Sequence, residues 1–201
     1  MIPASRLSFV LLTFNLLSLL LPATVRATVQ HYVVNGAESQ VSFAAHSTGH
    51  DFRGETSQLS GYFGYDRERI ADSAYGEIHV AVRGLRTGVS ARDRNMYSHF
   101  DADHYPEMVF RLKHLFAVQP VKTDTFTVQL TGELSIKGTT KEIPVTLSAV
   151  FASDGKIVIS GNTSLRMTDF GIEPPRFFFF QVAEEVQITF RVVGKAREPR
   201  L

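Results

Sequence analysis

The sequence predicts an all-β fold, an antiparallel up-and-down barrel of about eight strands with one short capping helix. Most segments beyond residue 28 alternate apolar with polar residues, which is the period of a strand with one buried face. Short turns, several with glycine, separate these segments, and a single central segment has a helical pattern. Such a meander fits a sandwich or a barrel, and long single-faced strands favour the barrel because closure removes exposed edges.

The first 27 residues are expected to form a secretory signal peptide rather than part of the fold. Arg6 precedes an apolar run at 7–21, and small residues before Ala27 offer a cleavage site, with Ala23 as the alternative. The run is shorter than the roughly 20 residues that a membrane span needs, which disfavours the alternative of an uncleaved anchor. We therefore expect a periplasmic or secreted protein.

The rest of the chain is expected to be one barrel domain at 28–195 with a tail at 196–201. Loss of Arg6 and Arg26 with the signal peptide changes the formal net charge from +1 to −1. A near-neutral domain gives no electrostatic reason to bind nucleic acid or an anionic membrane. The sequence has no cysteine, so the core alone must hold an exported domain together.

Four strands are predicted before the central segment. They lie at 31–34, 41–46, 59–65 and 78–82, and most of them place apolar residues at alternate positions. Glycines within the third strand mark a bulge or a tight bend at a barrel corner.

The strands after the central segment have a cleaner pattern. Apolar residues take even positions over 126–136 and odd positions over 143–151, and a short loop with a glycine joins the two runs. This predicts a hairpin whose apolar faces meet on one side. Pro144 cannot donate to the ladder and is expected at a bulge, a strand start or an outward position. A strand also resumes at Val109, and strands at 157–167 and 186–192 complete the predicted sheet.

The central segment predicts the capping helix. Ser90 stands three residues before Asp93, which is the spacing of an N-cap with an acid in the first turn. Apolar residues follow at helical spacing, and Pro106 prevents the helix from continuing. Asp93 is expected to stabilise the helix start, and Arg92 to bond loop carbonyls or a carboxylate near one end of the barrel. A single helix among strands is expected to cover that end.

Four stretches of the sequence carry a resemblance to a known family. They are 39–46, 134–145, 169–172 and a central run with Leu85, Thr87-Gly88, Arg92-Asp93, Met96, Tyr105-Pro106 and Phe110. Together, and in their order along the chain, they resemble the YceI-like family across 31–194. The resemblance implies an extended lipocalin-like barrel with a long apolar cavity that takes a polyisoprenoid or an acyl chain. The segments 50–54 and 173–180 depart from the family pattern and indicate a divergent branch.

Phenylalanine content supports an apolar cavity independently of the resemblance. Sixteen phenylalanines and no tryptophan provide a large apolar area with few polar groups. Burial of one methylene is worth about 0.8 kcal/mol, so a chain of roughly twenty carbons gains about 16 kcal/mol before the costs of binding. The other interpretation is that these rings fill the barrel. Arg92 is a candidate contact to a ligand head group. Alternation selects nine candidate lining residues: Phe43, Phe63, Phe110, Phe126, Val128, Leu147, Phe151, Leu165 and Phe190.

Two polar clusters contain side chains that can ligate zinc. The first cluster contains His46, His50 and Asp51, and the second contains His99, Asp101, Asp103 and His104. The first has the spacing of a metal site only if it is helical, and a glycine at its centre disfavours a helix. The second lies in a loop, where polar residues are expected.

The four phenylalanines at 177–180 have two interpretations. Alternate rings of an extended segment point to opposite faces, so the run fits a strand that is buried on both sides. It also fits an apolar lip at a cavity mouth that meets a membrane or a partner. We favour the first interpretation.

The sequence therefore predicts an exported protein that holds an isoprenoid, an isoprenoid quinone or an acyl chain in an apolar cavity. No nucleophile elbow, phosphate loop or zinc-protease motif is present, and we expect no catalysis, metal or cofactor. The expected partner is a long apolar lipid, with transient membrane contact and without nucleic acid. Two alternatives stay open: an interaction module with a filled barrel, and a metal-dependent protein that uses the His/Asp clusters.

Overall fold

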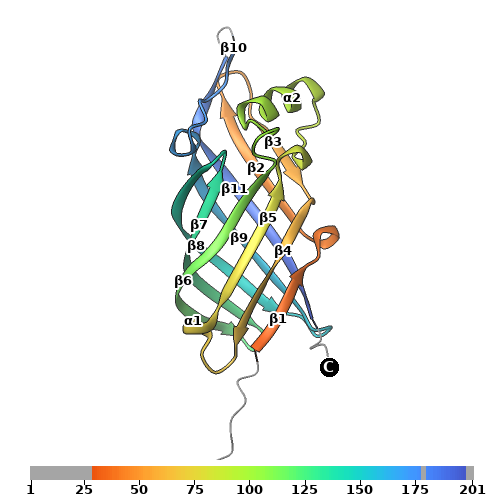
Figure 1. Ribbon diagram of the computed structural model, residues 1–201, viewed down its shortest axis with the longest axis vertical. Coiled ribbons are helices and arrows are strands. Elements are labelled where there is room, and N and C mark those ends of the chain that lie inside the picture. Colours follow the sequence, from red (N-terminus) through yellow and green to blue (C-terminus); the bar gives the residue numbers. More distant parts are fainter. Residues whose placement is uncertain (1–28, 178–179, 198–201) are drawn as a thin grey trace, which may run out of the picture.

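A computed structural model describes residues 29–177 and 180–197, without the side chains of Phe177 and Phe180. Eight antiparallel strands close into a barrel, which confirms the predicted fold class (Figure 1). The expected signal peptide and the phenylalanine run at 177–180 lie outside the described side chains. In order around the barrel the strands are β1 (Val29–Val34), β4 (Leu59–Asp66), β5 (Tyr75–Ala81), β6 (Glu107–Lys122), β7 (Thr125–Ile136), β8 (Thr139–Phe151), β9 (Lys156–Arg166) and β11 (Phe180–Ala196), which pairs back onto β1.

The strands do not all follow sequence order. β2 (Gln40–Ser47) and β3 (Phe52–Thr56) form a hairpin between β1 and β4 in the chain, but β2 pairs with β11. β11 is 17 residues long and pairs with both β2 and β1 along one side. Only its final residues pair with β1. The hairpin therefore continues the wall beyond the short strand β1, and this departure from a simple meander was not predicted.

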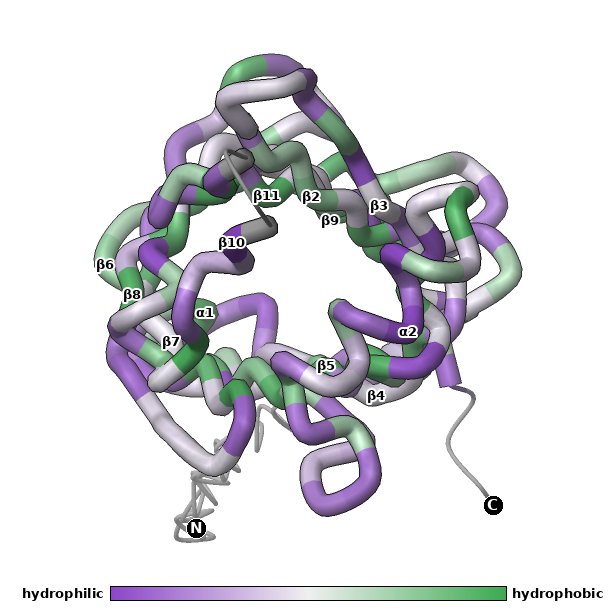
Figure 2. The backbone as a smooth tube through the Cα atoms, turned by 90° about the horizontal axis from the view of Figure 1, so that it is seen from above, coloured by the Kyte–Doolittle hydropathy of each residue, from purple (hydrophilic) through white to green (hydrophobic). Residues whose placement is uncertain are grey.

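Helices lie at both ends of the barrel. α2 (Ser90–His99) belongs to the β5–β6 connection and lies at the same end as β3 and the two-residue strand β10 (Arg176–Phe177) (Figure 1). Figure 2, seen from this end, shows α2 and β10 at the rim of the ring of strands. α1 (Ile70–Ser73) is a single turn in the β4–β5 connection at the opposite end. We call these the α2 end and the α1 end. The 3-10 helices are η1 (Gly36–Glu38), η2 (Val82–Gly84) and η3 (Met167–Phe170).

The start of α2 differs from the prediction. The Asp93 N–H donates to the Val89 carbonyl at 2.9 Å, so the first turn closes on Val89 and Ser90 is already helical. The predicted Ser90 N-cap is therefore wrong. The carboxylate of Asp93 instead accepts hydrogen bonds from the backbone N–H of Thr87, at 2.8 Å, and from the Thr87 hydroxyl. Asp93 stabilises the helix start as expected, but it does so by fastening the preceding loop.

The β7–β8 hairpin is confirmed. Ile136 pairs with Thr139, and the two residues between them, Lys137 and Gly138, have φ angles of 49° and 75°. Positive φ at both central positions gives a two-residue turn that matches the strand twist. Pro144 is exposed at an outward position of β8, which is one of the positions that the sequence allowed.

The last strand extends slightly further than predicted. β11 ends at Ala196, and the Arg197 N–H still donates to the His31 carbonyl at 2.8 Å. Backbone pairing thus fixes the chain beyond residue 195.

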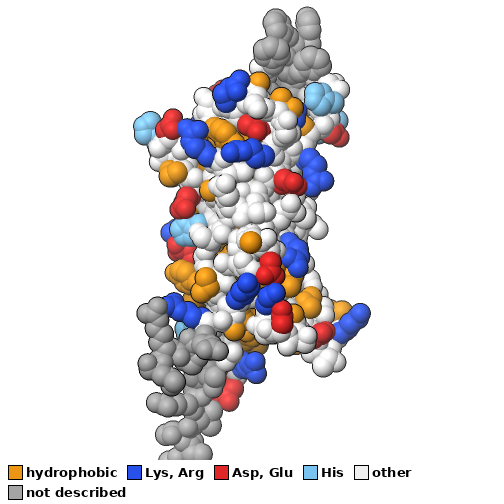
Figure 3. Space-filling view, turned by 90° about the vertical axis from the view of Figure 1, so that its right-hand side faces the viewer, with side chains coloured by type: hydrophobic (Ala, Val, Ile, Leu, Met, Phe, Trp, Pro, Cys, Tyr) orange, Lys and Arg blue, Asp and Glu red, His pale blue; other side chains and the backbone are white. Residues whose placement is uncertain are grey.

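The outer wall carries charges of both signs. Figure 3 shows one face of the molecule, on which Lys and Arg side chains are interspersed with Asp and Glu and hydrophobic groups are small and separate. Arg111 pairs with Glu77 at 2.7 Å, and Lys113 pairs with Glu133 at 3.0 Å. Exposed pairs of this kind contribute little to stability, so the inner face must supply most of it.

Candidate ligand-binding cavity

The barrel encloses an apolar cavity of about 540 Å³. It extends from Leu85 and Met96 at the α2 end to Ile70 and Phe151 at the α1 end. Every barrel strand except β1 contributes to the wall, as do β2 and β3. The volume lies within the range of about 300–1,000 Å³ that is usual for small-molecule sites.

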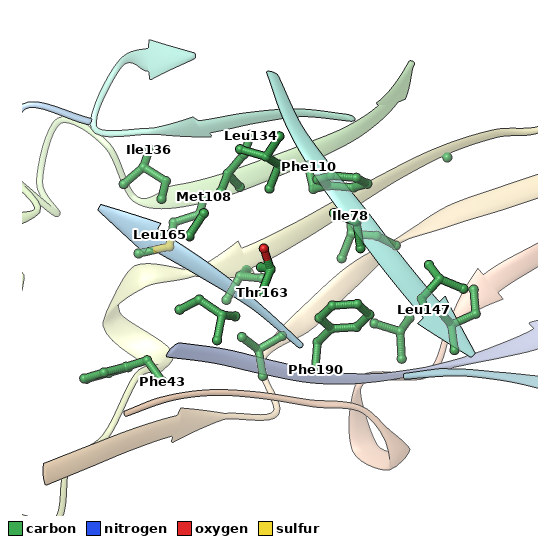
Figure 4. Close-up of a pocket in the computed structure, with 18 of the residues that line it drawn as sticks. Phe43, Ile78, Met108, Phe110, Leu134, Ile136, Leu147, Thr163, Leu165 and Phe190 are labelled. Carbon is green, nitrogen blue, oxygen red and sulfur yellow. The ribbon is translucent and has the colours of Figure 1, made fainter. Parts of the chain in front are cut away.

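All ten candidate residues from the sequence border this cavity. Among them only Val128 is buried, with 8% of its surface exposed, and the other nine are half-buried because their inner faces border the cavity. Figure 4 shows several of them around the central space with their neighbours from other strands. The phenylalanines therefore do not fill the barrel. That these residues touch a bound lipid stays a prediction. They are Phe43, Phe63, Arg92, Phe110, Phe126, Val128, Leu147, Phe151, Leu165 and Phe190.

Glycines explain how so many large rings leave a central space. The ring of Phe190 lies over Gly161, where an added Cβ would stand 2.7 Å from the ring. A Cβ on Gly132 would overlap the ring of Phe110. Two further pairs have the same arrangement, Phe43 over Gly54 and Phe63 over Gly194. Each ring thus lies against the wall where a neighbouring strand lacks a side chain, rather than across the lumen.

Some lining residues were missed because β6 is irregular. Its pairing with β7 shifts register three times, between Leu112 and His114, between Leu115 and Ala117, and after Pro120. Each bulge adds a residue, so inward side chains in this region come at spacing three, as Leu112, Leu115 and Val118. A leucine–leucine–valine series at spacing three is the feature of the sequence that could have revealed these inward positions.

Other lining residues that were not predicted follow the same alternation that selected the nine candidates. On β11, Val186 and Ile188 have the same parity as Phe190 and line the cavity with it. On β5, Ile78 and Val80 occupy alternate positions and also line the cavity.

Polar side chains border the cavity at the α2 end. Arg92, Asn95 and His99 reach it from α2. An Nη of Arg92 donates to the Thr87 carbonyl at 3.1 Å, which confirms the predicted bond to a loop carbonyl. The Arg92 guanidinium carbon lies 4.7 Å from the ring centroid of Phe52. Its Nε is buried without a hydrogen-bond acceptor among the described residues, so one donor is available beside the cavity.

Asp93 stays ionised beside this arginine. Burial acts to raise the pKa of the carboxyl, but the two hydrogen bonds from Thr87 and the charges of Arg86 and Arg92 outweigh it and lower the pKa. Since adjacent residues of a helix do not face each other, Asp93 fixes the loop while Arg92 borders the cavity.

An aromatic band crosses the α1 end. The rings of Tyr65 and Phe151 have centroids 6.3 Å apart, and those of Phe151 and Phe126 are 5.5 Å apart. On the other side Tyr32 stacks on Tyr65 at 6.2 Å and on Phe63 at 5.2 Å. Burial, with a smaller effect from Tyr32, raises the pKa of the Tyr65 phenol well above its usual range. We call these five residues the aromatic band.

The two His/Asp clusters do not converge on a common point. His46 contacts Asp51, and both side chains are 73% exposed. His104 bonds Asp101 at 2.8 Å, whereas Asp103 pairs with Arg83. Within 29–177 and 180–197, no three His, Asp or Glu side chains gather closely enough to hold a metal ion.

The sequence matches the model of the YceI-like domain over residues 32–194. The chain therefore belongs to the YceI-like domain family, a family of binding proteins that are generally non-catalytic. No curated protein matches the sequence.

Solved structures with the same fold include BcnA of Burkholderia cenocepacia, with a TM-score of 0.67 and 22% identity over 80% of this chain and 98% of that one. A polyisoprenoid binding domain from Saccharophagus degradans, implicated in plant cell wall breakdown, has a TM-score of 0.66 and 15% identity over 83% and 98% of the two chains. The YCEI protein of Campylobacter jejuni has a TM-score of 0.55 and 18% identity over 73% and 85%. At these identities the likeness shows the fold.

Proposed function

We propose that this protein is a non-catalytic lipid-binding protein that holds one long apolar molecule, an isoprenoid, an isoprenoid quinone or an acyl chain, along the barrel. The observation that carries the proposal is the apolar cavity of about 540 Å³ whose lining rings lie against the wall. The description of the Saccharophagus degradans structure as a polyisoprenoid binding domain supports the choice of ligand class. The cavity favours this function over an interaction module with a filled barrel.

Apolar burial alone is sufficient to hold such a molecule. At about 0.8 kcal/mol for each methylene, a long chain gains more than the roughly 4–15 kcal/mol that association costs. By the same arithmetic the apolar wall discriminates poorly between chains, because one methylene more or less changes affinity only a few-fold. Selectivity must come from polar groups.

The polar side chains give the ligand a direction. Arg92, Asn95 and His99 border the cavity at the α2 end, whereas the α1 end is crossed by the aromatic band. In the proposed complex the polar head of the lipid lies beside these side chains of α2, and the apolar chain points towards the α1 end. Arg92 supplies the head-group contact, because its buried Nε has no acceptor among the described residues.

The proposed location is the periplasm or the exterior of the cell. The support is the charged start, the apolar run and the small residues within 1–27. A lipid carrier in that location moves a water-insoluble molecule through an aqueous space, and brief contact with a membrane is then part of loading.

Blocking the lumen tests the proposed function. Ala149 lines the cavity from β8, and its neighbour Ser148 points to the outside of the same strand. Ala149→Trp is expected to reduce binding of a fluorescent polyprenyl lipid to delipidated protein more than tenfold, while Ser148→Trp leaves it within a factor of two. Circular dichroism checks that both variants fold. Equal affinity in the two variants contradicts a site inside the barrel.

A further inference from the structure

Between its two ends, the described wall of the cavity is interrupted by the hydroxyl group of Thr163. Thr163 lies on β9, where the other inward positions are Ile157, Ile159, Gly161 and Leu165. Figure 4 shows the Thr163 side chain, with its oxygen, among carbon side chains that include Phe110, Leu165 and Phe190. Thr163 is paired with Ile188 of β11 and is half-buried.

The other polar residues of the lining are at the ends or point elsewhere. Tyr65 belongs to the aromatic band, and the side chains of α2 lie at the opposite end. Arg166 turns outward to Glu184 at 2.9 Å, and Tyr75 lies outside the barrel over Gly64, against His31. Within the described part of the chain, Thr163 is thus the polar side chain at mid-depth of the cavity.

Among the described residues the Thr163 hydroxyl has no hydrogen-bond partner, although hydroxyls in apolar surroundings usually have one. Its oxygen is not enclosed by protein atoms, so it is accessible from the cavity. Valine has nearly the same shape and would present only methyl groups at this position. The hydroxyl is therefore best explained by a group that reaches it from the cavity.

The position of Thr163 fixes where that group lies. Thr163 stands three positions before Arg166, at the α2 end of β9, which is about 10 Å along the strand. It stands six positions after Ile157, which is about 20 Å. The geometry points to a ligand that carries an oxygen atom, as a carbonyl, ester or hydroxyl, about 10 Å from the α2 end, and Thr163 binds this oxygen. The inference rests on the proposed function, which it narrows from a long apolar chain with a polar head to a chain that also carries an oxygen atom at mid-depth of the cavity.

A set of stearic acids with a single hydroxyl at successive positions of the chain tests the inference. Affinities are measured by competition with a fluorescent fatty acid on delipidated protein. The wild type is expected to bind one hydroxyl position about fivefold more tightly than the average of the others, which is what one buried hydrogen bond of about 1 kcal/mol provides. In Thr163→Val this preference disappears, and unsubstituted stearic acid binds as well as to the wild type or better.

Thr189→Val is the matched control, because Thr189 is an exposed threonine on the outer face of β11. It is expected to keep the wild-type profile. A wild-type profile without a preferred position, or a preference that survives Thr163→Val, overturns the inference and leaves the proposed function intact. Failure of the wild type to bind any chain overturns both.

Discussion

At the α2 end the cavity is bordered by Arg92, Asn95 and His99, of which Asn95 is exposed, whereas at the α1 end it meets five packed aromatic rings. Tight packing is found at both ends, because Ile157 at the α1 end and Phe170 at the α2 end are each 2% exposed. The α1 end thus crosses the cavity with packed aromatic rings, whereas the α2 end adds the polar groups of a short helix to its packed residues. The contrast implies that ligand selection is located at the α2 end, and that the aromatic band can be changed separately from it.

The largest expected effect is on stability at the α1 end. Phe151→Ala removes the central ring of the aromatic band and is expected to lower the free energy of unfolding by about 3 kcal/mol, at the low end for such truncations because the ring is half-buried. Met96→Ala at the α2 end is expected to cost about 1 kcal/mol. Urea unfolding of the delipidated proteins measures both. Equal losses would show that the two ends do not differ in this way.

The next effect concerns the rings that lie over glycines between the two ends. Gly132→Ala places a methyl group where the Phe110 ring now lies and forces the ring into the lumen. We expect about a tenfold loss of affinity for a polyprenyl lipid, or about 1.4 kcal/mol. The double variant Gly132→Ala, Phe110→Leu gives the methyl group room and is expected to recover most of the affinity. No recovery would mean that Gly132 acts through the strand and not through the ring.

A smaller effect is expected from head-group selection at the α2 end. Arg92→Gln is expected to weaken binding of a lipid with an oxygen-bearing head about fivefold, because it removes one hydrogen bond that contributes about 1 kcal/mol. The affinity for a polyprenyl hydrocarbon stays unchanged. Arg94→Gln, an exposed position of α2, serves as the control. Equal losses for both lipids would place the role of Arg92 in folding.

The smallest effects are in pH dependence, and they differ in sign between the ends. The pKa of Asp93 is lowered in the folded state, so its contribution to stability is present above the unfolded pKa of about 4 and is lost as pH falls through the folded pKa. The pKa of Tyr65 is raised, so its contribution is present below about pH 10 and is lost as pH rises above that value. Asp93→Asn is expected to flatten the acid limb of the stability curve, and Tyr65→Phe the alkaline limb. Unfolding curves measured across pH check both, and a change on the opposite limb would refute the assignment.

The regular strands could be predicted from the sequence, and so could the residues on them. β7, β8, β9 and the part of β11 from Val186 onward keep strict alternation, so Phe126, Leu147, Leu165 and Phe190 were placed on the inner face correctly. Alternation cannot tell whether an inward ring fills the lumen or lies against the wall. That depends on which residue of the neighbouring strand is a glycine, and hence on strand register.

Irregular backbone explains the failures. Three bulges in β6 shift the inward positions, and nothing in a period-two pattern records an added residue. The pairing of β2 with β11 joins residues that are far apart in the chain, and no local pattern specifies it. The cap of α2 was misplaced because the Asp93 side chain bonds to a loop residue six positions earlier rather than to the first turn.

The central claim is that a long apolar lipid occupies the barrel with its polar atoms towards the α2 end. Mass spectrometry of organic extracts from the protein, purified from its native compartment without detergent, tests it most directly. We predict one near-stoichiometric species with a long isoprenoid or acyl chain and at least one oxygen atom, and its absence from the Ala149→Trp variant. Wild-type protein that yields no such species, and that also fails to take up added polyprenyl or acyl chains, would contradict the account.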